Sequence, residues 1–133
     1  MHFSEQEVKH FLLPKDKVIY SYVVKDDKNQ ITDFFSFYNL PSSILKHPDH
    51  DTLWVAYSYY SFSKTNRYEE LTKNALIMAK KEKFDVFNIL DLQDNKPYLR
   101  DLKFSPGDGH LHYYLYNWRL ANIEPKDVGM VLV

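Results

Sequence analysis

The sequence predicts an α+β domain in which helices flank a mixed sheet. Runs of β-branched and aromatic residues recur between polar turns, which is typical of strands. Residues 67–82 place apolar side chains three and four positions apart, which indicates a helix. A nearly unbroken apolar run at 84–90 has the length of a buried strand. The chain has 133 residues, the size of one domain with its own core.

The first expected element is a short helix at 5–12. Ser4 and Glu7 have the spacing of a capping box, in which each side chain satisfies a backbone N–H of the other residue. Pro14 should end this helix, because proline cannot donate the hydrogen bond that a helix interior needs.

A β-hairpin is expected next. The runs 18–24 and 31–38 are β-branched and aromatic, and a polar turn separates them. The segment 40–43 contains Pro41 and should stop the second strand. Residues 46–51 combine a proline with aspartates, which favours a connector.

A third strand is expected at 53–60, followed by the most strongly patterned helix, at 67–82. Asn66 is placed to cap this helix, and Lys80 and Lys81 complement the dipole at its end. Its apolar face is predicted to consist of Tyr68, Leu71, Ala75, Met78 and Ala79.

The last third of the chain is expected to complete the sheet. The run 84–90 reads as a central strand covered on both faces. A helix at 95–102 has Pro97 in its first turn, where a missing N–H costs nothing. Strands are expected at 111–119 and 128–132. The side chains that this helix should bury are Tyr98, Leu99 and Leu102.

Composition and charge exclude several classes of function. Lys and Arg number 17 against 18 Asp and Glu, so the net charge of −1 gives little support to nucleic-acid binding. An apolar run of the roughly 18 to 20 residues that cross a bilayer is missing, as are the zones of a secretory signal. We therefore expect a soluble, cytoplasmic domain. The absence of cysteine excludes a disulfide scaffold and a thiol nucleophile.

The chain ends in the apolar run Gly129–Val133, which would draw the free α-carboxylate toward the protein interior. Removing an unpaired carboxylate from water costs on the order of several kcal/mol. The carboxylate is therefore expected to be paired or used. The alternative is a terminal strand that is merely tucked against the sheet.

Several blocks of sequence together resemble the C-terminal portion of the N-myristoyltransferases, over Phe3 to Val133. Where that family has glycine directly after a Lys-Phe pair, this chain has Ser105 and then Pro106, a departure that affects the local turn. The blocks that carry the resemblance are 84–92, Lys103-Phe104, Gly107-Asp108-Gly109, the Tyr-rich run 111–118 and the terminal Gly-Met-Val-Leu-Val.

The resemblance implies half of the N-myristoyltransferase fold, an acyl-CoA N-acyltransferase-like mixed sheet. Those enzymes are longer, have two similar halves, and bind acyl-CoA mainly through the N-terminal half. By resemblance, the complete enzyme transfers myristoyl from myristoyl-CoA to the N-terminal glycine amine of proteins. This chain would supply the peptide groove and the catalytic base, would bind no cofactor itself, and would be inactive alone. Consistently, 61–70 lacks the glycine-rich turn that cradles phosphates.

The same resemblance assigns site residues. The α-carboxylate of Val133 corresponds to the base that accepts a proton from the glycyl ammonium. Asp108 corresponds to an acidic contact for a cationic part of the substrate, although a turn aspartate that bonds its own backbone is an equal alternative. Asn88 corresponds to a polar groove contact, although a buried amide is more often satisfied by backbone. The substrate-binding set is Ser42, Tyr57, Asn88, Asp108, Gly109 and Leu111.

Two histidine pairs and several serines are weak candidates for chemistry. His47 with His50, and His110 with His112, have a spacing that could hold a metal, but two imidazoles in a polar loop are a weak signal. The serines lack the context of a nucleophile elbow, so a serine hydrolase has almost no support. We expect no metal site.

Two alternative functions remain open from the sequence. One is a non-catalytic module that binds a peptide or an acyl chain, and the other is a small N-acetyltransferase. The expected partners are proteins that begin with glycine and an N-terminal half of the enzyme. An isolated half should expose an apolar face, so self-association, including strand exchange between copies, is also expected.

Overall fold

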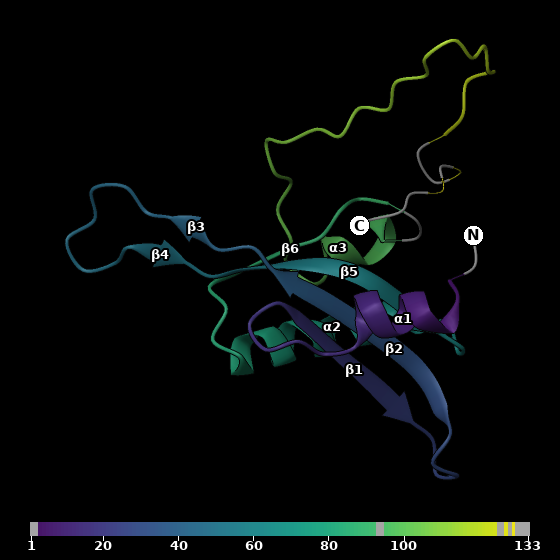
Figure 1. Ribbon diagram of the computed structural model, residues 1–133, viewed down its shortest axis with the longest axis horizontal. Coiled ribbons are helices and arrows are strands. Elements are labelled where there is room, and N and C mark those ends of the chain that lie inside the picture. Colours follow the sequence, from purple (N-terminus) through teal and green to yellow (C-terminus); the bar gives the residue numbers. More distant parts are fainter. Residues whose placement is uncertain (1–2, 93–94, 125–126, 128, 130–133) are drawn as a thin grey trace.

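A computed structural model describes residues 3–92, 95–124, 127 and 129. Its main sheet has four strands in the order β1-β2-β5-β6 (Figure 1). β1 (Ile19–Lys25), β2 (Ile31–Asn39) and β5 (Val55–Ser63) are antiparallel neighbours, and β6 (Val86–Asn88) is parallel to β5. The predicted hairpin and the mixed character of the sheet are confirmed.

Two short strands form an arm that extends away from the main sheet (Figure 1). β3 (Ser42–Ser43) pairs with β4 (Thr52–Leu53), and the predicted connector 46–51 forms the loop between them. Leu40 N–H donates to the carbonyl of Val55 at 3.0 Å and ties the base of the arm to β5.

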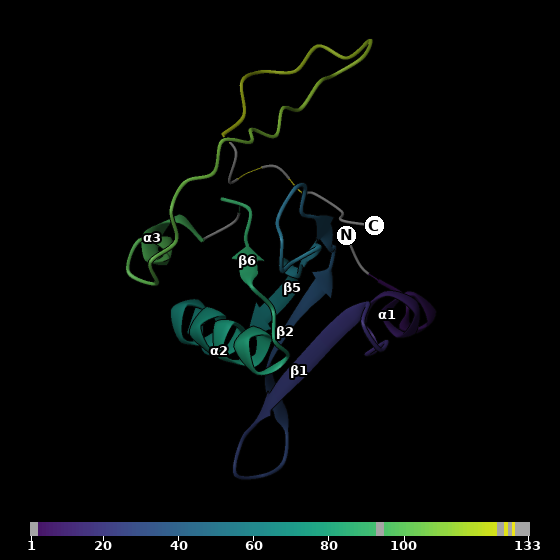
Figure 2. The same cartoon turned by 90° about the vertical axis from the view of Figure 1, so that its left-hand side faces the viewer.

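Two helices lie on opposite sides of the sheet (Figure 2). α1 (Glu5–Leu12) begins with the predicted capping box: Ser4 N–H donates to the Glu7 carboxylate at 2.7 Å, and Glu7 N–H donates to Ser4 Oγ at 3.3 Å. The contact between the rings of Phe3 and Tyr60, at 5.4 Å, places the start of this helix against β5.

The second helix, α2 (Tyr68–Lys81), covers the other face and forms the core. Phe37 of β2 is fully buried, and its ring lies 5.2 Å from Tyr20, 5.6 Å from Phe84 and 5.7 Å from Phe87. Leu71, Ala75 and Ala79 are buried as predicted, and Tyr68 and Met78 are half-buried. The remaining core residues are Phe35 and Ala56.

The predicted Asn66 cap of α2 is wrong. The N-cap is Arg67, without a capping side chain, while Asn66 has φ 59°. Asparagine tolerates this left-handed conformation, so Asn66 turns the chain from β5 into the helix. Ser63 Oγ accepts the Arg67 N–H at 3.1 Å and satisfies one of the free donors at the helix start.

α2 and the third helix, α3 (Lys96–Leu99), end in the same way. Lys83 and Lys103 each have φ 65°, and the phenylalanine after each donates its N–H to a carbonyl five residues earlier: Phe84 to Ala79 at 3.0 Å, Phe104 to Leu99 at 2.9 Å. This is the hydrogen-bond pattern of a Schellman motif. Both phenylalanine rings then pack inward, Phe84 on Phe37 and Phe104 on Phe87.

The expected central strand at 84–90 is wrong in position and length. β6 has three residues and lies at an edge, paired with β5 alone among the described strands. Phe84 and Phe87 pack against the core, whereas Val86 and Leu90 are exposed. An apolar run predicts cover on both faces, but among the described residues only the face with Phe84 and Phe87 is covered.

α3 is shorter than the expected 95–102. Pro97 is in its first turn, Tyr98 is buried, and Leu99 and Leu102 are half-buried. The strand expected at 111–119 is wrong: residues 105–124 belong to no helix or strand and form a long loop that extends away from the sheet and then turns back (Figure 1). A strand needs a neighbour to pair with, and this segment has none in the described structure. The strand expected at 128–132 lies outside the described residues, apart from Gly129.

Candidate functional site

A row of polar and aromatic side chains crosses the sheet face that is turned away from α2. Tyr57 of β5 is the register partner of Tyr38 on one side and of Asn88 on the other. Directly opposed residues of paired strands project to the same face. Tyr38 follows the core residue Phe37, and successive side chains alternate, so the row lies on the face opposite α2. The structure therefore brings together two predicted site residues, Tyr57 and Asn88.

Aromatic rings extend this row along β5. Tyr38 stacks on Tyr57 with ring centroids 5.4 Å apart and an interplanar angle of 14°. Tyr59 meets Tyr38 edge-on at 5.6 Å and contacts Tyr60 at 4.5 Å. Burial raises the pKa of both Tyr38 and Tyr59, so these phenols stay protonated at neutral pH. The surface can hold an extended chain against flat rings and offer it hydroxyl groups.

The sequence analysis missed Tyr38 and Tyr59 as members of this surface. The available signal was the alternation of β2, in which Tyr38 follows an inward-facing phenylalanine. Asn88 also differs from expectation, because it is exposed at the sheet edge and makes no side-chain hydrogen bond to a described residue. Its amide can therefore both donate to and accept from a bound peptide.

Ser42, Asp108, Gly109 and Leu111 lie apart from the row. Ser42 is exposed on β3, beyond the base of the arm. Asp108 and Gly109 are exposed in the segment after α3, and Leu111 is 56% exposed. Val133, the predicted base, lies outside the described residues. The described structure thus does not gather these residues around Tyr57 and Asn88.

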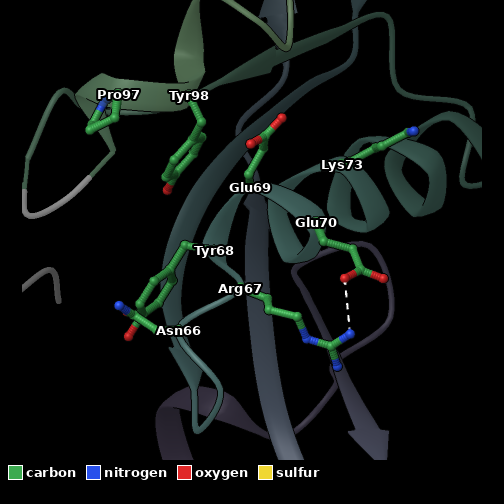
Figure 3. Close-up of a pocket in the computed structure, with 8 residues that line it drawn as sticks. All are labelled: Asn66, Arg67, Tyr68, Glu69, Glu70, Lys73, Pro97 and Tyr98. Atoms are coloured by element: carbon green, nitrogen blue, oxygen red, sulfur yellow. Dashed lines mark hydrogen bonds and ion pairs between the residues drawn. The ribbon is translucent and has the colours of Figure 1, made fainter.

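A cavity of about 770 Å³ lies elsewhere, between the start of α2 and α3 (Figure 3). Tyr68 and Tyr98 line it together with Glu69 and Lys73, and Arg67 pairs with Glu70 at 3.1 Å. Charges of both signs lie on exposed side chains there, and none of the predicted site residues that the structure describes contributes to its wall. It is not the predicted groove.

A buried carboxylate links the sheet to the start of α2. Asp33 of β2 is 3% exposed and accepts hydrogen bonds from the hydroxyls of Ser63 and Thr32, the latter at 2.6 Å. These two bonds, with a smaller contribution from the Arg67 charge, hold the pKa of Asp33 below its ordinary value. Because Ser63 also accepts the Arg67 N–H, this network has a structural role.

The histidine pairs offer few metal ligands. The His47 and His50 rings lie 5.0 Å apart, and His47 Nδ1 accepts the backbone N–H of Asp49 at 3.2 Å. The His110 and His112 rings are 6.3 Å apart. Within the described ranges, three or more His, Cys, Asp or Glu side chains nowhere gather as a metal would require. Likewise, no described helix combines the length and apolar character of a membrane span.

Comparison with known proteins gives one consistent family. The family profile described as "Myristoyl-CoA:protein N-myristoyltransferase, C-terminal domain" matches residues 1–131. The chain is 49% identical over 129 residues to a probable glycylpeptide N-tetradecanoyltransferase of Caenorhabditis elegans, covering 97% of this chain and 29% of that protein. It is 48% identical over 133 residues to glycylpeptide N-tetradecanoyltransferase 1 of Arabidopsis thaliana, covering 98% and 31%.

Solved structures agree. The Saccharomyces cerevisiae N-myristoyltransferase with bound myristoyl-CoA superposes with a TM-score of 0.76 at 38% identity, over 80% of this chain and 31% of that one. A predicted acetyltransferase of Clostridium acetobutylicum has a TM-score of 0.55 at 13% identity, which shows a shared fold alone. The chain therefore spans about a third of the length of these relatives, and the expected acyltransferase-like fold is confirmed.

Proposed function

This chain belongs to the N-myristoyltransferase family, as its C-terminal domain, and we propose that it forms the peptide-binding half of an enzyme that transfers myristoyl from myristoyl-CoA to the N-terminal glycine of proteins. The observation that carries the proposal is the family match over residues 1–131, together with the pairing of Tyr57 and Asn88 on one sheet face. The relatives named for this transfer cover almost the whole chain.

In this proposal the aromatic row forms one wall of a groove for an extended peptide. Tyr57, stacked on Tyr38, covers apolar parts of the peptide, and the Asn88 amide bonds its backbone. Ser42 adds a hydroxyl from the arm. Asp108 attracts a cationic part of the substrate, while Gly109 and Leu111 shape the floor near the reacting amine.

The reaction requires an unprotonated amine. A free α-ammonium has a pKa of about 7.7–8.0, and only its neutral form can attack the thioester carbonyl of myristoyl-CoA. In the proposal the α-carboxylate of Val133 accepts that proton, because burial makes a carboxylate a stronger base. The amine then forms the amide bond as the C–S bond of the thioester breaks, and the proton that the nitrogen loses in this step goes to coenzyme A, which leaves as the thiol.

The groove is tested in this chain joined to the upstream, acyl-CoA-binding region of a relative. Tyr57→Ala and Asn88→Ala should raise KM for a glycine-starting peptide about tenfold or more, because each removes a contact worth about 1–2 kcal/mol, while kcat changes less. Ile31→Ala, an exposed substitution at the far end of β2, is the control. Unchanged KM in both groove variants would contradict the proposed wall.

The base is tested separately in the same joined protein. Adding one residue after Val133, or deleting Val133, should slow single-turnover acyl transfer at saturating peptide more than it weakens peptide binding, because the proton acceptor moves while the groove remains. Equal transfer rates in the extended and unextended proteins would contradict the assignment of Val133 as the base. They would not contradict the proposed groove.

A further inference from the structure

A buried serine contacts the backbone of the neighbouring strand at an irregular point of the sheet. Ser36 of β2 is 3% exposed and lies between two core residues, Phe35 and Phe37. Side chains alternate along a strand, so Ser36 projects to the face opposite α2. Its hydroxyl donates to the carbonyl of Tyr60 at 3.0 Å and accepts the N–H of the same residue at 3.1 Å. A single side chain therefore serves both backbone groups of one residue on β5.

These two bonds lie where β5 holds one residue more than β2. Tyr59 and Tyr60 together oppose Ser36, which is the arrangement of a β-bulge. The extra residue of a bulge disrupts the ladder locally, and buried backbone groups then need other partners. The Ser36 hydroxyl supplies such partners for Tyr60. The regular pairs that bracket the bulge are Phe35 with Ser61 and Phe37 with Ser58.

The bulge places two neighbouring tyrosines on one face of the sheet. In a regular strand the rings of Tyr59 and Tyr60 would point to opposite faces. Here the Tyr59 ring meets Tyr38 edge-on at 5.6 Å, within the aromatic row of Tyr38, Tyr57 and Tyr59. The Tyr60 ring lies 4.5 Å from that of Tyr59 and 5.4 Å from that of Phe3, next to the start of α1. The bulge therefore sets the position of one end of the aromatic row.

The register is fixed on both sides of the bulge. Toward the start of β5, Tyr57 pairs with Tyr38. Toward its end, Ser63 pairs with Asp33 and donates its hydroxyl to that buried carboxylate. A slip of one residue would turn Ser63 away from Asp33, because a slip moves every side chain to the other face. Loss of the Ser36 hydroxyl should therefore loosen the bulge and leave the register of the sheet unchanged.

We propose that Ser36 is a positioning residue for the peptide groove. By holding the backbone of Tyr60 it fixes the bulge, and the bulge fixes how the aromatic row presents its rings. Ser36 acts through Tyr60 and does not contact the peptide, because its hydroxyl is buried in these two bonds. This inference rests on the proposed function, in which Tyr57, stacked on Tyr38, covers apolar parts of the peptide.

Ser21 is a matched control within the same sheet. It is the register partner of Ser36 on β1, so both side chains project to the same face. Its hydroxyl is also buried, but it has no hydrogen-bond partner among the described residues. Its replacement by alanine therefore deletes the same atom from a neighbouring position without changing a bond to the bulge.

The first test measures steady-state acyl transfer by this chain joined to the upstream region of a relative. Ser36→Ala should raise KM for a glycine-starting peptide about threefold or more while kcat changes less, because it weakens the wall and not the proton acceptor. Ser36→Thr keeps the hydroxyl and should restore KM, and Ser21→Ala should leave KM unchanged. Ser36→Cys, whose thiol is only a weak donor and acceptor, gives the same test if the alanine variant does not fold.

The second test measures amide hydrogen exchange at Tyr60, by NMR of the joined protein carrying isotope-labelled tyrosine. Ser36→Ala should speed exchange at this amide about tenfold or more, because the N–H loses its acceptor and the bulge opens more easily. Ser36→Thr and Ser21→Ala should leave the rate unchanged. This measurement does not depend on the transfer reaction.

The outcomes separate this inference from the proposed function. An unchanged exchange rate at Tyr60 in Ser36→Ala, or an unchanged KM in that variant while Tyr57→Ala raises KM, would overturn the role of Ser36 and leave the groove standing. An equal rise of KM in Ser21→Ala would also overturn it, because loss of either hydroxyl would then have the same effect. Unchanged KM in both Tyr57→Ala and Asn88→Ala would overturn the groove, and the role of Ser36 with it.

Discussion

The core region, made of β1, β2, β5 and α2, and the aromatic segment at 111–118 have the same kind of sequence and very different environments. Phe35 and Phe37 of β2 are 5% and 0% exposed, whereas Tyr114 and Tyr116 are 87% and 86% exposed. β2 lies between two strands and under a helix. Within the described ranges the aromatic segment has no such strand or helix beside it, so the comparison shows that burial is set by partners and not by apolar composition alone.

The largest effect is expected from Phe37→Ala, because the fully buried ring packs against Tyr20, Phe84 and Phe87 and its removal leaves a cavity. The free energy of unfolding should fall by about 3–5 kcal/mol. Urea denaturation followed by circular dichroism measures it. A loss below about 1 kcal/mol would mean that the core region is no better packed than the aromatic segment.

A smaller loss in the free energy of unfolding is expected from Asp33→Ala at pH 7, because the Ser63 and Thr32 hydroxyls lose their buried acceptor. The cost is about 1–3 kcal/mol. The folded state lowers the pKa of Asp33, so this contribution is present above the unfolded value of about 3.9 and is lost as pH falls through the folded pKa.

The pH dependence supplies the control for Asp33. The stability difference between the unmodified chain and Asp33→Asn, an uncharged side chain of the same size, should be largest near neutral pH and shrink in acid below about pH 4. A difference that stays constant from pH 7 to pH 3 would exclude a role for the charge.

The two Lys-Phe helix ends allow a finer comparison between the regions. Lys83 and Lys103 both have positive φ, which glycine adopts without the steric cost of a side chain. Lys83→Gly, at the end of the long helix of the core region, should stabilise the chain by up to about 1 kcal/mol. Lys103→Gly, at the short α3, should gain less, because peripheral elements open locally.

Lys81→Gly is the matched control for these glycine variants. Lys81 is the last residue of α2, so glycine there should destabilise by up to about 1 kcal/mol. Thermal unfolding measures the Tm of the three variants and so gives their order of stability. If Lys83→Gly and Lys81→Gly shift Tm in the same direction, the positive φ is not what distinguishes the two positions.

The smallest effect is expected from Tyr116→Ala in the monomer. Its side chain is 86% exposed, so the free energy of unfolding should change by less than about 0.5 kcal/mol at concentrations where the chain is monomeric. Urea denaturation at low concentration measures it. A loss comparable to that of Phe37→Ala would place the segment within the core of its own molecule.

Several predictions from the sequence depended on local signals, and these are confirmed. The Ser4 and Glu7 spacing located α1, the polar turn located the hairpin, and helical spacing located α2 and its buried residues. The Asn66 cap failed although its signal is local, because asparagine is favoured both as a cap and as a left-handed turn residue.

The residues of the candidate site were selected by the resemblance, and their arrangement in space could not be predicted from the sequence. Tyr57 and Asn88 are neighbours because β5 and β6 are parallel and in register, although 31 positions separate them in the chain. The same register adds Tyr38 to the row, which the sequence analysis did not select. For Ser42, Asp108, Gly109, Leu111 and Val133 a shared site stays a prediction.

By itself the sequence determined the capped start of α1, the hairpin, the position of α2, the mixed α+β class and the family, because each rests on residues close in the chain or on matched motifs. Only the tertiary structure decided that the run 84–90 contributes a three-residue strand at the edge of the described sheet and that 111–118 forms no strand with a described neighbour. The physical reason is that a strand is defined by hydrogen bonds to a neighbour, and an apolar side chain is buried only where a distant part of the protein, or another molecule, covers it.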